Sequence, residues 1–163
     1  MLTTDPTSAR ALASARLLVS GSAALPVPVF TGLAELTGHS PVERYGCTET
    51  LITVSTRAAG ERRPGSVGLP LGMQTRLVGE DGGPVAHDGE TIGSLQVLTP
   101  TMFHGYLHRP EATAASFEPD GWYRTGDAAV IGPDGMHRIA GRESVDMIKS
   151  GGYRVGAGEI ETA

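Results

Sequence analysis

The chain of 163 residues has one cysteine, one lysine and few aromatic side chains, which make up 5% of the total. The single Cys47 excludes a disulfide within the chain and indicates a reducing compartment, for which we expect the cytoplasm. Few aromatic residues and a formal net charge of −5 argue against a nucleic-acid partner. The longest apolar runs are too short for a membrane span, so we expect no membrane partner either.

Glycine and proline, by contrast, are abundant, with 23 and 11 residues, so the chain is rich in turns. Within residues 1–60, the sequence predicts a strand at 16–20, a loop of small residues at 21–25, a helix at 26–37 and a strand at 41–45. Strand, helix and strand joined by short loops predict a parallel sheet. Ligands bind beyond the carboxyl ends of such strands, where the small-residue loop and the segment after residue 45 lie.

The pattern changes after residue 60. Within 61–140, alternating strands are expected at 73–78, 94–98, 128–131 and 136–139, separated by Gly- and Asp-containing turns, with a short helix at 111–116. This predicts a small antiparallel, barrel-like subdomain. Residues 141–163 are expected to form a hinge and the first helix of a small C-terminal domain. The predicted class is therefore α/β: the end of a parallel α/β subdomain, an antiparallel β subdomain and a hinge.

Three segments combine polar side chains with glycine, in the order Arg44–Thr50, Gly121–Asp127 and Gly141–Tyr153. Glycine permits close approach of the backbone to a ligand and positive φ. The first segment offers a hydroxyl and a carboxylate, which suit a phosphate and its metal ion. The second ends in a carboxylate that suits a ribose diol, and the third begins with a guanidinium that suits phosphate or ribose oxygens.

On these segments, together with the loop Ser20–Leu25, the chain resembles the adenylate-forming acyl-CoA synthetases. The resemblance runs from about Arg16 to the last residue and is closest to malonyl-CoA and methylmalonyl-CoA synthetases. It implies activation of a small carboxylic acid by ATP and Mg²⁺ through an acyl-adenylate, followed by transfer of the acyl group to CoA. Alternatives are a synthetase for a fatty or other acid, or a non-catalytic nucleotide-binding remnant of the same fold.

The resemblance also implies roles for single residues. Thr48 would bond the α-phosphate and Glu49 would bind Mg²⁺, which makes these two the expected catalytic residues. Asp127 would accept hydrogen bonds from both ribose hydroxyls, Tyr45 would lie against the adenine, and Arg142 would contact ribose or phosphate. The expected nucleotide-binding set is Gly21, Ser22, Ala23, Tyr45, Gly46, Thr48, Asp127 and Arg142. The plainer alternatives are a polar surface loop, an ordinary turn at Asp127, and an ion pair between Arg142 and Glu143.

The acyl group is expected to contact Arg44, with Ser20 or Ser22 assisting. A cation beside a fatty tail is costly to bury, but it becomes favourable when the substrate carries a second carboxylate. The alternative is that Arg44 pairs with Glu43 or Glu49 at the surface.

The junction segment is expected to hold the pivot of a mobile small domain. In many members of the family, the Asp of this motif follows the Arg by three positions. In this chain Asp146 follows Arg142 by four. We expect the pivot at Ser144 or Val145. The segment Ser150, Gly151 and Gly152 would line the path of the CoA pantetheine, although a Gly-Gly pair is also typical of an ordinary turn.

Two catalytic elements of the resembling enzymes have no counterpart in these residues. One is a phosphate loop rich in Ser, Thr, Gly and Lys, expected upstream. The other is a lysine of the small domain, expected beyond Ala163, since the chain's only lysine, Lys149, lies in the junction. We therefore expect the chain to be a fragment that is inactive alone and works with the missing parts of its own full-length protein.

Overall fold

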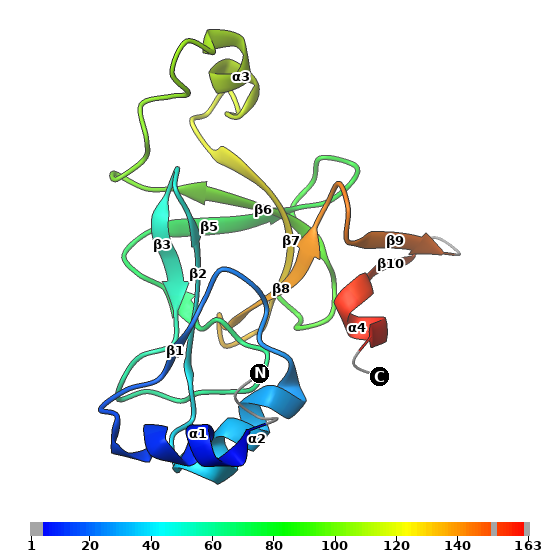
Figure 1. Ribbon diagram of the computed structural model, residues 1–163. Coiled ribbons are helices and arrows are strands. Elements are labelled where there is room, and N and C mark those ends of the chain that lie inside the picture. The colour runs from blue at the N-terminus through cyan, green and yellow to red at the C-terminus, as the bar shows by residue number, and fades with distance from the viewer. Residues whose placement is uncertain (1–4, 151–152, 162–163) are drawn as a thin grey trace.

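The computed structural model describes residues 5–150 and 153–161. The elements, labelled in Figure 1 where there is room, are α1 (Pro6–Ala11), the 3-10 turn η2 (Leu12–Ser14), β1 (Val19–Ser20), α2 (Val27–Thr37), β2 (Val42–Cys47), β3 (Leu51–Ser55), β4 (Leu69–Pro70), β5 (Gln74–Val78), β6 (Gly93–Leu98), α3 (Pro110–Ala115), β7 (Tyr123–Ile131), β8 (His137–Arg142), β9 (Met147–Ser150), β10 (Tyr153–Gly156) and α4 (Ala157–Glu161).

The predicted strand–helix–strand unit is present. Strand β1 pairs in parallel with β2, and α2 connects them and ends at Gly38, whose left-handed φ of 74° closes the helix. The sheet continues beyond this unit, in the order β1-β2-β3-β4, because β3 and β4 add antiparallel strands that we did not predict. The first sheet is therefore mixed rather than parallel.

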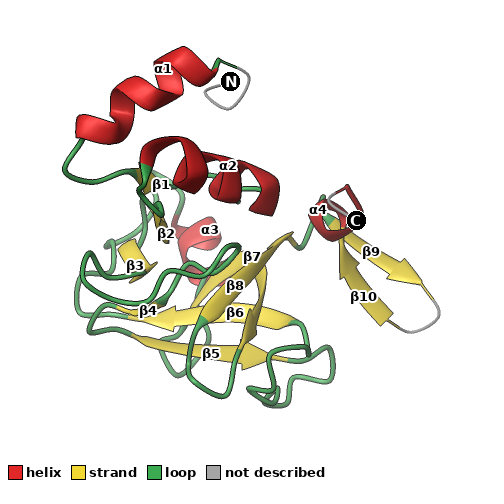
Figure 2. Ribbon diagram, turned by 90° about the horizontal axis from the view of Figure 1, so that it is seen from below, coloured by secondary structure: helices red, strands yellow, loops and turns green. Residues whose placement is uncertain are grey.

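A second, antiparallel sheet has the order β5-β6-β7-β8. Its core is a cluster of Leu77, Leu95, Ala129 and Ile131. Tyr45 of β2 packs against this cluster and so links the two sheets. Figures 1 and 2 show how the second sheet lies beside β2 and β3, while α1 and α2 gather at one end of the molecule.

The expected antiparallel β subdomain is confirmed, but its sheet does not close into a barrel within residues 5–150 and 153–161. The free edge of β8 does not close on β5. It is met instead by the segment before β4, where the His137 amide donates to the Gly68 carbonyl at 2.8 Å and the Val67 amide donates to the His137 carbonyl at 2.9 Å. These two backbone hydrogen bonds join the two sheets at this point.

The junction forms an antiparallel hairpin of β9 and β10, followed by α4. Figure 2 shows the hairpin standing out from the body of the molecule. The division into residues 1–60, 61–140 and 141–163 stays a prediction; its second boundary lies inside β8. None of the described helices is long and apolar enough to span a membrane.

Candidate active site

The three glycine-containing segments meet at Asp127. Asp127 on β7 lies opposite Arg142 on β8, and the Arg142 Nε is 3.2 Å from Asp127 Oδ1. The Tyr45 hydroxyl, at the end of β2, donates to Asp127 Oδ2 at 2.5 Å. Tyr45 and Asp127 are 82 residues apart in the sequence, so only the pairing of the two sheets brings them together.

Asp127 is 7% exposed, and its neighbours have opposing effects on the pKa of its carboxyl. Burial raises the pKa of this carboxyl, while the hydrogen bond from Tyr45 and the charge of Arg142 act to lower it. Burial and the charge of Asp127 raise the pKa of Tyr45, so its hydroxyl remains a proton donor at neutral pH. A carboxylate accepts about four hydrogen bonds, so each Asp127 oxygen retains capacity for a ligand hydroxyl.

Arg142 lies across the turn of the second segment. Its Nη1 donates to the Thr125 carbonyl at 2.8 Å and is 3.3 Å from the position that a Cβ on Gly126 would occupy. Gly126 also has a φ of 73°, which favours glycine. The alternative pairing of Arg142 with Glu143 was wrong, because the Glu143 carboxylate accepts from Ser94 and lies 3.5 Å from Arg154 instead.

Thr48 and Glu49 lie in the turn between β2 and β3, where Thr48 is exposed and Glu49 is half-buried. Glu49 Oε1 accepts a hydrogen bond from the Tyr106 hydroxyl at 2.8 Å. Burial acts to raise the pKa of Glu49, but hydrogen bonds, led by that of Tyr106, bring it below its usual value. Glu49 is therefore ionised, and its hard oxygens suit Mg²⁺.

The described residues contain no group of three or more His, Cys, Asp or Glu side chains that could hold a metal ion by themselves. Mg²⁺ is commonly bound by one or two carboxylates together with substrate phosphates. Glu49 beside the exposed Thr48 fits that mode of binding, in which phosphate oxygens and water molecules supply the remaining ligands.

Gly46 is required by the protein's own backbone. It lies at a bulge in the pairing of β2 with β3, and a Cβ there would be 1.9 Å from the Leu51 carbonyl oxygen and 2.8 Å from the Ile52 Cα. From the sequence, we expected a glycine here to let a ligand approach the backbone closely. In the structure, the backbone of β3 approaches Gly46 closely as well.

We expect Gly46→Ala to lower the free energy of unfolding of the full-length protein by about 1–3 kcal/mol or more, because the backbone of β3 must move to admit the methyl group. Thermal unfolding measures the loss. Gly158→Ala is a matched control, because nothing lies within 4 Å of the added Cβ in α4 and alanine favours a helix. Equal unfolding temperatures for Gly46→Ala and the wild type would contradict the steric argument.

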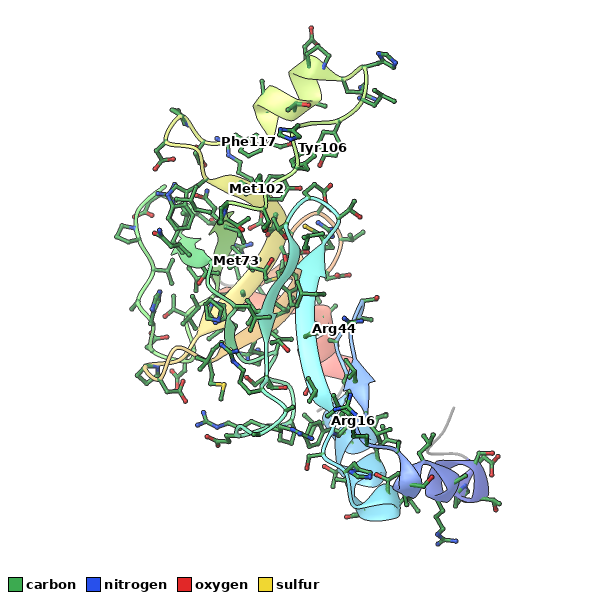
Figure 3. All side chains as sticks on the ribbon, turned by 90° about the vertical axis from the view of Figure 1, so that its left-hand side faces the viewer. Arg16, Arg44, Met73, Met102, Tyr106 and Phe117 are labelled. Atoms are coloured by element: carbon green, nitrogen blue, oxygen red, sulfur yellow. The ribbon has the colours of Figure 1, made fainter. Side chains whose placement is uncertain are left out.

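Arg44 lies against the small-residue loop. A Cβ on Gly21 would be 3.2 Å from both Cγ and Nε of Arg44, so the absence of a side chain at Gly21 leaves room for the arginine. Ser22 has a φ of 74°, and residues 21–24 are exposed. Figure 3 shows Arg44 beside β1 and β2, and among the described residues it forms no ion pair.

The alternative partners of Arg44 are occupied elsewhere. Glu43 is 4% exposed and accepts a hydrogen bond from the Gly65 amide at 3.1 Å; burial raises its pKa to about 7. Glu49 is held by Tyr106. The alternative surface pairs of Arg44 with these carboxylates are therefore absent from the described residues, and Arg44 is an exposed residue.

The junction turn presents Ser144 and Val145 to solvent, with Val145 78% exposed. Asp146 is fixed instead: its Oδ2 accepts from the Arg142 amide at 2.8 Å, and its Cβ lies close to Gly141. Ser150 ends β9. Gly151 and Gly152 lie outside the described residues, so the proposed path of the pantetheine stays a prediction.

Sequence reasoning missed two aromatic residues of this site. Tyr106 reaches Glu49 from 57 residues away, and the Tyr123 hydroxyl is 3.3 Å from the Tyr106 hydroxyl. Tyr123 lies within the Gly121–Asp127 segment and Tyr106 lies outside all three segments, but no local pattern indicates that the two hydroxyls meet beside Glu49.

Residues 1–107 match the family model described as AMP-binding enzyme. The chain belongs to this family. A mitochondrial malonate–CoA ligase of Bos taurus is 45% identical over 165 residues, which cover 90% of this chain and 28% of that protein. A probable CoA ligase of Humulus lupulus is 43% identical, over 97% of this chain and 26% of that protein.

The fold is also similar to that of solved AMP-binding enzymes. A malonyl-CoA ligase in a ternary product complex with methylmalonyl-CoA and AMP is 56% identical, with a TM-score of 0.78 over 99% of this chain and 35% of that one. ATP-bound MatB from Rhodopseudomonas palustris is 35% identical, with a TM-score of 0.83 over 96% and 33%. The chain thus spans about a quarter to a third of the length of these relatives.

Proposed function

We propose that this chain is part of an ATP-dependent acid–thiol ligase that activates malonate or methylmalonate and transfers the acyl group to CoA. The observation that carries the proposal is the meeting of the three segments at Asp127, where Tyr45 and Arg142 both contact one buried carboxylate. The similarity to malonate–CoA ligases supports the choice of acid.

In this proposal a carboxylate oxygen of the acid attacks the α-phosphorus of ATP, and pyrophosphate leaves. Asp127 binds the ribose diol and Arg142 contacts the ribose or phosphate oxygens. Thr48 would bond the α-phosphate, and Glu49 would hold a Mg²⁺ ion, which would supply positive charge to the phosphates. The loop Gly21–Ala23 would lie against the nucleotide. In the second step the CoA thiol would attack the acyl carbonyl carbon and AMP would leave, and the junction turn with Ser150 would line the path of the CoA.

Arg44 gives the substrate class its physical basis. Its guanidinium is exposed beside the small-residue loop, and its two acidic neighbours are engaged with other partners. Such a group binds a second carboxylate bidentately. The expected cytoplasmic location stays a prediction; the relative from Bos taurus is mitochondrial.

ATP–pyrophosphate exchange with malonate tests the proposal. We expect the full-length protein to turn over at an ordinary enzyme rate, about 10 s⁻¹. These 163 residues expressed alone should give no exchange, because they include neither the phosphate loop nor the small-domain lysine of the resembling enzymes. Binding of ATP without exchange by the full-length protein would instead favour a nucleotide-binding remnant, and exchange with fatty acids alone would favour a different synthetase.

A further inference from the structure

The lobe formed by residues 99–118 contacts Glu49 at two points. The Tyr106 hydroxyl donates to Glu49 Oε1 at 2.8 Å, and the Phe103 amide donates to the Glu49 carbonyl at 2.9 Å. The lobe thus holds both the backbone and the side chain of the turn that carries the candidate metal-binding carboxylate. Figure 3 shows Tyr106 and Phe117 in this lobe, above the ends of β2 and β3.

The Tyr106 ring is fixed by its neighbours. It packs edge-on against Phe103, with ring centroids 4.9 Å apart, and Phe103 packs in turn against Phe117 and Tyr123. The Tyr106 amide donates to the Thr113 hydroxyl at 2.9 Å, which ties the loop to α3. A ring held on two sides directs its hydroxyl to one point with little loss of entropy on binding.

The Tyr106 hydroxyl has two hydrogen-bond partners, Glu49 Oε1 and the hydroxyl of Tyr123. Tyr106 as a residue is 37% exposed, so the ring lies at the surface of the lobe and not in a closed core. The nearby Tyr123 hydroxyl, 3.3 Å away, has its pKa raised by burial and by the hydrogen bond with Tyr106, so it stays protonated. Tyr106 occupies one lone pair of Glu49 Oε1, which leaves the other acceptor sites of the carboxylate for a ligand.

We propose that Tyr106 is a positioning residue that fixes the orientation of the Glu49 carboxylate toward the metal-bound phosphates of ATP. This rests on the proposed function. Partners that orient a ligating side chain from behind typically change metal affinity or activity by about 10- to 100-fold when they are removed. The aromatic cluster of Phe103, Tyr106, Phe117 and Tyr123 is then a rigid support for the metal site, in addition to a small core under α3.

Tyr106→Phe in the full-length enzyme tests this, since it removes only the hydroxyl and keeps the ring. Ser116→Ala is the matched control: it also removes one hydroxyl from the lobe, but that hydroxyl bonds only the Ala112 carbonyl of α3. Mn²⁺ replaces Mg²⁺ as the probe, so that paramagnetic resonance reports the metal retained in the presence of ATP. Calorimetry with AMP in the absence of metal reports the rest of the nucleotide site.

We expect Tyr106→Phe to weaken Mn²⁺ retention about tenfold, with AMP affinity unchanged and Ser116→Ala like the wild type. Adding Tyr106→Phe to Glu49→Gln should have little further effect, because the two residues act through one carboxylate. Unchanged Mn²⁺ retention in Tyr106→Phe, or an equal loss of AMP affinity, would overturn the inference. If the wild type itself gave no pyrophosphate exchange, the proposed function would fail instead, whatever the metal binding of the variants.

Discussion

Arg44→Leu should lower the activation of malonate at least tenfold, while the activation of propionate changes much less or improves. Arg44 is exposed here, so the charge pair would form and lose its water only when the acid binds; removing one partner of such a pair typically costs about 2–5 kcal/mol. Propionate has no second carboxylate to leave unpaired, and a leucine offers its methyl group an apolar contact. Pyrophosphate exchange with malonate, methylmalonate, propionate and acetate, in the full-length enzyme and its variant, measures the preference.

Arg10→Leu is a suitable control for Arg44→Leu, because it also removes an exposed arginine, here from α1, and leaves the loop at Gly21 intact. It should leave the ratio of malonate to propionate activity unchanged. An equal loss with both acids in Arg44→Leu would show that the arginine supports the structure of the loop. The choice of a dicarboxylate would then rest on similarity to malonate–CoA ligases alone.

The parts of the fold that the sequence predicted are those that local signals determine. The helix ending at Gly38 and the two strands around it depend on neighbouring residues, and they were confirmed. Strand β3 was missed because it follows a turn of only three residues, and its first residue, Leu51, takes a left-handed φ of 58°. The bridge between Gly68 and His137 at the edge of the second sheet joins residues far apart in the sequence, so no local pattern indicates it.

The same division holds for the candidate site. Glycine-bounded motifs predicted Asp127, Arg142 and Glu49 one by one, because each motif is contiguous. What the motifs did not predict is the partner of each: the Tyr45 hydroxyl on Asp127, and the Tyr106 hydroxyl on Glu49. Such pairs depend on how the sheets and the lobe pack, and hydroxyl donors carry no sequence signature of their own.

Asp127→Ala should weaken nucleotide binding far more than binding of the acid. Losing a carboxylate that accepts hydrogen bonds typically costs about 1.5–3 kcal/mol, so we expect the Kd for AMP to rise roughly 10- to 100-fold. Calorimetry of the full-length enzyme with AMP, and separately with malonate, measures the two affinities. The physical reason is that Asp127 is the buried acceptor at the point where the three segments meet, and a vicinal diol needs two acceptors in one place.

Two further variants separate a direct contact from a structural role, since Asp127 also holds Tyr45 and Arg142. Asp127→Asn keeps the shape of the side chain but leaves only one acceptor oxygen, so AMP affinity should still fall. Tyr45→Phe removes the internal hydrogen bond and keeps the carboxylate, so its loss of AMP affinity should be smaller than that of Asp127→Asn. A folded Asp127→Asn variant that binds AMP as tightly as the wild type would remove Asp127 from the ribose site, and the convergence of the three segments would then serve the packing of β2 against β7 and β8 alone.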